Sequence, residues 1–203
     1  MRSTQAFRAF DHAFPSWADG VLIPHGIDDR VRNRGPMTLG LSHDTSQVAC
    51  DSFRWDWNRI GTRGSPQATS ILWLCDCGGS TAANTDLFTH DVQRLAEQIG
   101  VEIRVAHSPS SCSKYHVIER RLFPHITRAC QGLLFDTLDT VVTLMRKAAT
   151  STGLRTTVKG IRRHDETGRK ATEHMKQNLK IVCDHLLPKW HYRAIPQHAT
   201  VIN

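Results

Sequence analysis

The chain has 203 residues, of which 39% are hydrophobic and 22% are charged; this is typical of a globular core, and no apolar run approaches the roughly 18 residues of a membrane span. The formal net charge is +7, but residues 1–150 hold 16 Lys and Arg against 15 Asp and Glu, whereas residues 151–203 hold 10 against 4. A basic segment after a near-neutral core favours a polyanionic partner, nucleic acid first, with a solvated helix surface as the alternative.

The chain opens with an irregular segment. Residues 1–35 mix proline and glycine with short apolar fragments, which predicts a turn-rich lead-in. Residues 37–41 form a short strand candidate. Either Asp44 or Thr45 can then cap a helix that extends to Ile60, because glycine and proline follow it.

The stretch Ser70–Ser80 reads SILWLCDCGGS. The apolar run 71–75 predicts a strand buried on both faces, and Asp76 follows where the run stops. Gly78 and Gly79 then permit a sharp turn. A carboxylate at the end of a buried strand is held rigidly yet is open to solvent, which is where α/β folds place chemistry. A carboxylate that only caps the turn is the alternative.

Two further elements follow this stretch. Apolar side chains recur at helical spacing over 85–99, and Gly100 comes just after them, so we expect a helix there. Residues 101–105 alternate apolar and polar side chains, as a half-buried strand does. The order of strand, helix, strand, helix and strand requires crossover connections, which predicts an α/β fold with a mixed or parallel sheet flanked by helices.

The second half of the chain is expected to be mainly helical. Residues 114–128 carry a helical stripe that Pro124 should kink or divide, and a second helix is predicted over 133–149. A short piece at 153–160 is expected to be extended. A basic amphipathic helix is then predicted over roughly 167–187, stopped by proline.

Glu119 lies in the basic and aromatic stretch 113–123. Lys114, Arg120 and Arg121 can hold phosphates while the carboxylate holds a divalent metal ion, and phosphodiester chemistry needs both. An ordinary salt bridge between Glu119 and a neighbouring cation is the alternative.

A zinc site is a weaker alternative. Cys75 and Cys77 would point to one face of their strand, and a site would need partners such as His107 and Cys112. The six cysteines have no framework spacing and include no Cys-x-x-Cys pair, so free thiols are expected.

Several separated motifs, in order, carry a resemblance that covers nearly the whole chain. They are Asp11–Gly26, Ser70–Ser80, Ile103–His107, Cys112–Tyr115, Ile118–Glu119, Arg121–Gly132, Thr150–Leu154, Thr167–Lys170, Leu187–Trp190 and Tyr192–Pro196. Together they resemble the Rhodopirellula-type DDE transposases of bacterial insertion sequences.

The resemblance implies an RNase H-like, retroviral-integrase-like domain in which three acids bind two Mg²⁺ (or Mn²⁺) ions for DNA cleavage and strand transfer. Asp76 matches the second acid and Glu119 the third, so both are expected to be catalytic metal ligands. The residues expected to bind DNA are Lys114, Tyr115, Arg120 and Arg121.

The match also has departures. The family's first acid lies on a strand upstream of the part that residues 11–26 resemble, so we expect an N-terminally truncated transposase without the first strands and the first catalytic Asp. His116, Val117 and Arg120 stand where the family usually has Asn, Pro and His. Substitute first acids are not expected, because none lies on the central strand; the candidates are Asp28, Asp29 and Asp44.

The expected organisation is a lead-in over 1–35, a partial RNase H-like DDE catalytic core over 36–150 and a basic helical C-terminal extension over 151–203. We expect a transposase fragment that is incomplete as a catalyst alone. The alternative is an inactive DNA-binding remnant or an inhibitor of the full-length transposase. Its expected partners are transposon-end DNA and either itself or the full-length enzyme, in the nucleoid of a bacterial cytoplasm and not at a membrane.

Overall fold

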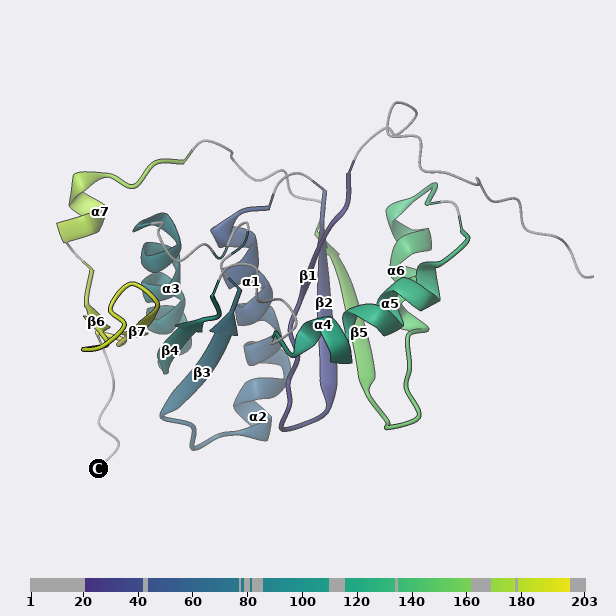
Figure 1. Cartoon of the computed structure of the whole chain (residues 1–203), viewed down its shortest axis with the longest axis horizontal. Helices are drawn as coiled ribbons and strands as arrows, with labels where there is room; N and C mark the ends of the chain where they lie inside the picture. Colours follow the sequence, from purple (N-terminus) through teal and green to yellow (C-terminus); the bar gives the residue numbers. More distant parts are fainter. Residues whose placement is uncertain are drawn as a thin grey trace, which may run out of the picture. The chain divides into compact units, whose positions relative to one another are not determined.

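The computed structural model describes residues 21–41, 44–76, 78, 81, 86–109, 116–133, 135–161, 169–177 and 179–197. The chain divides into two compact units (Figure 1). The first unit comprises Met1–Ser42 and Ile118–His164, and the second comprises His43–Val117 and Asp165–Asn203. The organisation expected from the sequence, with boundaries at 35 and 150, stays a prediction. No helix in the described ranges is long and apolar enough to cross a membrane.

The first unit has a mixed three-stranded sheet in the order β1-β2-β5. Strand β1 (Ile23–Gly26) pairs antiparallel with β2 (Arg34–Gly40), and β2 pairs in parallel with β5 (Arg155–Ile161). The extended piece predicted at 153–160 is thus a strand, and the strand predicted at 37–41 is part of β2.

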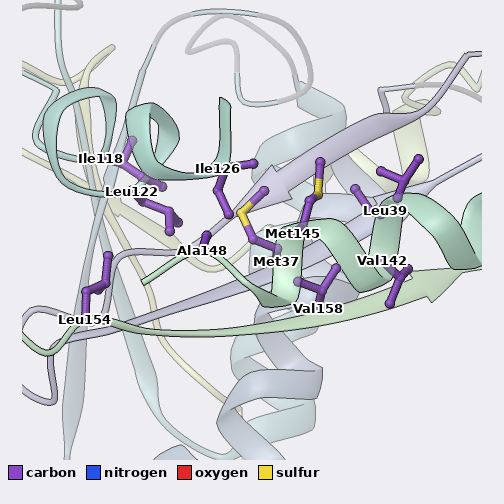
Figure 2. Packing of buried hydrophobic residues seen from close by; sticks show 11 residues of the cluster. Met37, Leu39, Ile118, Leu122, Ile126, Val142, Met145, Ala148, Leu154 and Val158 are labelled. Carbon is purple, nitrogen blue, oxygen red and sulfur yellow. The ribbon is translucent and has the colours of Figure 1, made fainter. Parts of the chain in front are cut away.

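Three helices pack on this sheet: α4 (Ile118–Arg121), α5 (Phe123–Cys130) and α6 (Leu138–Arg146). Pro124 lies in the first turn of α5, where no intrahelical N–H is needed, and so divides the predicted helix as expected. The helices and β2 share one apolar core (Figure 2). Its buried residues are Met37, Leu39, Ile118, Leu122, Ile126, Val141, Val142, Met145, Ala148, Leu154 and Val158.

The second unit has a mixed four-stranded sheet in the order β3-β4-β7-β6. Strand β3 (Ser70–Cys75) pairs in parallel with β4 (Glu102–His107). Strand β7 (His191–Ala194) pairs antiparallel with β4 on one side and with β6 (Ile181–Cys183) on the other. The crossover between β3 and β4 contains α3 (Asp86–Ile99).

Helices cover one face of the β3 end of this sheet. The Trp73 ring lies 4.7 Å from the Phe53 ring of α1 (Ser46–Asp56) and 5.8 Å from the Phe88 ring of α3. The Thr45 hydroxyl caps α1 by accepting a hydrogen bond from the Val48 N–H at 3.3 Å. After α1 come a π-helical turn, η2 (Trp57–Gly61), and α2 (Thr62–Gly64), so the helix extends about as far as predicted.

The expectation that the strand after Ser70 is buried on both faces is wrong. Leu72 is 63% exposed and Leu74 49% exposed, whereas Cys75, which alternates with them, is buried. The physical reason is position: β3 is the edge strand of its sheet among the described residues, and α1 and α3 pack only on the face that carries Trp73.

The expectation of a basic helix over 167–187 is also wrong. In the described part of this range, the helix α7 covers only Glu173–Gln177, and a β-hairpin of β6 and β7 follows. Pairing with β4 buries Tyr192 and Ala194 on the covered face of the sheet, a long-range gain that outweighs the local helical pattern.

Candidate functional site

Asp76 lies where β3 ends, at the carboxyl end of the parallel pair β3–β4. Its side chain is exposed, although Cys75 directly before it is buried. The Ser108 N–H donates to the Cys75 carbonyl at 2.8 Å, which ties the end of β3 to the end of β4. The acid is therefore held by a fixed backbone and reaches solvent, as the sequence predicted.

The turn after β3 supports the Asp76 carboxylate. Thr81 Oγ1 lies 2.8 Å from Asp76 Oδ1, its shortest contact, and 3.2 Å from the Asp76 carbonyl oxygen. No other described residue hydrogen-bonds this carboxylate in the structure. A Cβ added at Gly78 would lie 3.4 Å from Asp76 Oδ2, an ordinary van der Waals distance, so Gly78 lies beside that oxygen. Thr81 thus orients one oxygen, and no described residue donates a hydrogen bond to the other.

His107 supports the same corner from β4. The ring is only 4% exposed, and its Nδ1 lies 3.4 Å from the Asp76 carbonyl oxygen. Burial lowers the pKa of His107, and this outweighs the opposing effects of the Asp76 carbonyl and carboxylate. A neutral ring with the proton on Nδ1 donates to that carbonyl.

Glu119 is exposed on α4 of the first unit, and its neighbours fix the helix to the sheet. A Cβ at Gly26 would lie 3.2 Å from Ile118 Cδ1, and one at Gly35 would lie 2.4 Å from Leu122 Cδ1. These two glycines therefore let α4 approach the β1–β2 hairpin closely. Ile118 and Leu122 are buried, which leaves Glu119 facing solvent.

The sequence comparison decides the family. Residues 1–196 match the Rhodopirellula transposase DDE domain. The chain belongs to this family. The mixed α/β architecture with helices on two mixed sheets is consistent with a DDE transposase domain. No curated protein and no solved structure matches the chain.

Asp76 of this DDE domain belongs to the second unit and Glu119 to the first, so each is positioned within its own unit. Within the described ranges, no group of three or more His, Cys, Asp or Glu side chains is arranged to hold a metal ion. Cys75 is buried and in no disulfide there, and the other two cysteines of the zinc alternative, Cys77 and Cys112, lie outside the described residues.

The residues expected to bind DNA are placed in part. Arg120 is exposed on α4. Arg121 Nε lies 3.1 Å from Asp28 Oδ2, and its Nη2 donates to Asn33 Oδ1 at 2.8 Å, so this guanidinium braces α4 against the β1–β2 connection. Lys114 and Tyr115 lie outside the described residues. The DNA role of all four stays a prediction.

Sequence reasoning missed two residues that support the candidate site at Asp76. Thr81 follows Asp76 by five positions, and nothing in the spacing indicates that the turn brings them together. The sequence marks His107 only as a motif residue and as a zinc partner, because its contact with Asp76 depends on the parallel register that pairs Cys75 with His107. A strand-end histidine beside a strand-end acid is the signal that could have indicated it.

Proposed function

We propose that this chain functions in DNA transposition, with Asp76 and Glu119 as two of the carboxylates that bind Mg²⁺ or Mn²⁺ for phosphodiester cleavage and strand transfer. Membership of the DDE family supports the activity. The observation that carries the proposal is Asp76 itself, an exposed acid fixed at the carboxyl end of β3. Thr81 orients one of its oxygens, and no described residue donates a hydrogen bond to the other.

The residues fit such an ion in their chemistry. Mg²⁺ and Mn²⁺ prefer oxygen ligands, and both acids are exposed carboxylates. When bound, the ions would supply activation of the attacking oxygen and stabilisation of the leaving oxygen. Thr81 and the strand-end hydrogen bonds hold the Asp76 carboxylate in place. The packing of Ile118 and Leu122 holds α4, which carries Glu119, against its sheet.

The third carboxylate is proposed to come from a strand that pairs with the outer edge of β3, as in an RNase H-like sheet. The support is the edge itself: β3 pairs only with β4 among the described strands, and it carries no proline, charge or bulge that would protect it. An acid on a strand added there would lie beside Asp76. A chain without that strand is proposed to be incomplete as a catalyst.

Metal binding and DNA cleavage test the proposal separately. Mn²⁺ binding is measured by calorimetry for the wild-type chain, Asp76→Asn and Glu119→Gln, with the exposed Glu97→Gln as the matched control. Cleavage of supercoiled plasmid is measured with Mg²⁺ or Mn²⁺. Each site variant should weaken Mn²⁺ binding by at least about 100-fold, the upper end of the cost of a lost supporting residue. Unchanged Mn²⁺ affinity in both would contradict the proposed site.

A second candidate function is DNA binding without catalysis, either as a remnant or as an inhibitor that associates with a full-length transposase. The excess of 10 Lys and Arg over 4 Asp and Glu in residues 151–203 favours it. This candidate predicts salt-sensitive DNA binding that survives Asp76→Asn and Glu119→Gln while no variant cleaves DNA. Metal-dependent cleavage that both substitutions abolish would exclude it.

A further inference from the structure

Asn33 joins three segments of the first unit. Its Nδ2 donates to the Thr152 carbonyl at 2.9 Å, and its Oδ1 accepts from Arg121 Nη2 at 2.8 Å. Its own carbonyl accepts from the Arg155 N–H at 3.2 Å. The β1–β2 connection and the turn before β5 lie at the same end of the sheet (Figure 1), and α4 reaches them through Arg121. We call this region the Asn33 corner; it comprises residues 28–34, 120–121 and 150–155.

Hydrogen bonds fix the backbone of the Asn33 corner. Asn33 has a φ of +50°, the left-handed conformation that asparagine adopts more readily than most residues. In the turn before β5, Thr150 Oγ1 accepts from the Leu154 N–H at 3.0 Å. Ser151 is exposed in this turn. The exposed side chains of the corner are therefore carried by an ordered backbone, which lowers the ordering cost of binding a partner.

Both acids of the β1–β2 connection are already paired within the corner. Asp28 Oδ2 lies 3.1 Å from Arg121 Nε. Asp29 Oδ2 lies 3.0 Å from Arg32 Nη1 and 3.7 Å from Arg34 Nε. The two acidic side chains are only 6% and 14% exposed. Their charges therefore neutralise the arginines that hold the corner together.

Two further arginines of the corner have no acidic partner among the described residues. Arg30 lies in the turn after Asp29, and Arg155 begins β5; both are exposed, and neither is in an ion pair with a described residue. Arg155 also pairs in register with Arg34, and like charges that face each other across neighbouring strands destabilise a sheet. Residues 147–154, which lead into β5, contain no acid. The described surface of the corner thus carries uncompensated positive charge, which a bound anion would relieve.

We propose that the Asn33 corner binds the phosphate backbone of duplex DNA. Arg30 and Arg155 neutralise phosphates, and the exposed Ser151 hydroxyl donates a hydrogen bond to a phosphate oxygen. The inference rests on the proposed function for its partner. Guanidinium and hydroxyl groups are typical donors to DNA phosphates, and duplex DNA supplies dense negative charge. Such contacts orient the duplex and read no base sequence.

The place of the corner in the fold gives this contact a role in the proposed reaction. Arg121, which donates to Asn33, is two residues after Glu119 on α4. Glu119 is the acid of that helix, and the exposed Arg120 beside it balances its charge. A duplex bound at the corner is therefore held next to the helix that carries one proposed metal ligand, by contacts within a single unit.

The salt dependence of DNA binding tests the contact. The full chain is titrated into a labelled duplex at about 50 to 200 mM NaCl, and affinity is read from anisotropy. The corner variant is Arg30→Ala with Arg155→Ala. The matched control is Arg63→Ala with Arg128→Ala, which removes the same charge from two exposed arginines outside the corner. These arginines are likewise in no ion pair with a described residue.

The corner variant should lower the slope of log affinity against log salt by about two, because each lost phosphate contact contributes about 0.9. Its affinity should fall roughly tenfold at about 200 mM NaCl and by more at lower salt. The control should keep the wild-type slope. The melting temperature of the corner variant should not fall, because both side chains are exposed and the loss of Arg155 removes its repulsion with Arg34.

An unchanged slope in the corner variant would overturn the inference. An equal reduction in the control would also overturn it, because net charge alone would then attract the DNA. Competition with a polyglutamate peptide tests an acidic protein as the partner. A peptide that displaces the duplex at an equal concentration of charges, and loses this ability in the corner variant, would overturn the assignment to DNA.

Failure of the contact is distinguishable from failure of the proposed function. A slope that falls in the corner variant, without metal binding that depends on Asp76, would keep the DNA contact and refute the metal site. Metal-dependent cleavage, with a wild-type slope in the corner variant, would refute the contact alone.

Discussion

Arg169 holds Asp91 in a bidentate ion pair, with Nη1 3.0 Å from Oδ2 and Nη2 2.9 Å from Oδ1. The Asp91 side chain is only 3% exposed, and the Ser46 hydroxyl donates to its Oδ2 at 2.5 Å. The guanidinium also donates to Gln47 Oε1 at 3.1 Å. Arg169 therefore fastens the C-terminal segment to α1 and α3, and this cation of the basic segment serves the fold of the second unit.

Replacing one partner of this pair should destabilise the protein. Arg169→Gln leaves the buried Asp91 charge without its cation, which typically costs about 3 kcal/mol in the free energy of unfolding. Asp91→Asn should cost less in an Arg169→Gln background than in the wild-type protein, because the two effects are coupled. Urea denaturation measures both. Lys176→Gln, which removes an exposed pair with Glu173, should change the free energy of unfolding little. Equal losses in Arg169→Gln and Lys176→Gln would contradict the stabilising role of the Arg169–Asp91 pair.

Gly35→Ala should loosen the support of Glu119. The added Cβ would lie 2.4 Å from Leu122 Cδ1, and Leu122 is fully buried, so it has no free space to move into. Such overpacking typically costs about 1–3 kcal/mol. Thermal unfolding measures the loss, and Gly35→Ala combined with Leu122→Ala should be less destabilised than the sum of the single variants. Additive losses would show that the close approach of α4 to β2 is not tight.

Local signals were sufficient for several elements of the fold. Thr45 supplies a cap that the α1 backbone uses, and the apolar spacing of α3 reports its buried face directly. Pro124 divides a helical stripe because it cannot donate a hydrogen bond in a helix interior. The acid at Asp76 could be found because a charge directly after an apolar strand run marks where a strand leaves the core.

Long-range pairing explains what could not be predicted. Tyr192 is buried because β7 pairs with β4, and no short window contains both strands. The apolar spacing that suggested a helix before Pro188 is equally compatible with the short strand β6. The apolar run 71–75 is equally typical of a central strand and of an edge strand. The exposure of Leu72 can therefore be inferred only from the strand order. Thr81 reaches Asp76 through the turn after β3, and His107 reaches it through the register between β3 and β4.

Leu72→Lys should reduce self-association of the chain. Leu72 is 63% exposed on β3, which among the described strands is an edge strand without protective charge, and such edges pair with one another. A lysine opposes that pairing by charge and needs no repacking of the core. Sedimentation velocity should show a shift towards monomer with an unchanged melting temperature. Val31→Lys, at a still more exposed site of the first unit, is the control, and the same shift in that variant would point to net charge alone.

Thr81→Val should weaken metal binding at Asp76 without unfolding the protein. The hydroxyl orients Asp76 Oδ1 at 2.8 Å, and the loss of such supporting hydrogen bonds typically costs about tenfold in metal affinity. Thr81→Ser keeps the hydroxyl and should bind Mn²⁺ like wild type. Thr62→Val, which removes an exposed hydroxyl beside the Asn58 carbonyl, is the matched control. Calorimetry decides, and a Thr81→Val affinity equal to that of the serine variant would refute the supporting role.

His107 should make the stability of the metal-free protein depend on pH. In the unfolded chain its ring titrates near the ordinary value of about 6.5, whereas burial keeps its folded pKa lower. The ring faces the Asp76 charge, which favours protonation, and His191, which opposes it. As the pH falls through about 6.5, the unfolded chain therefore binds a proton that the folded protein does not.

The free energy of unfolding should consequently fall from about pH 6.5 towards the lower folded pKa, and this group should add no slope at higher pH. Urea denaturation of wild type and His107→Gln across this range isolates the contribution, because the difference curve cancels the other histidines. His185→Gln, on the exposed β6–β7 loop, is the control. Nuclear magnetic resonance of the His107 ring gives an independent reading if the glutamine variant does not fold. A folded His107 pKa at or above the ordinary value would refute the prediction, and so would the same pH slope in a folded His107→Gln protein.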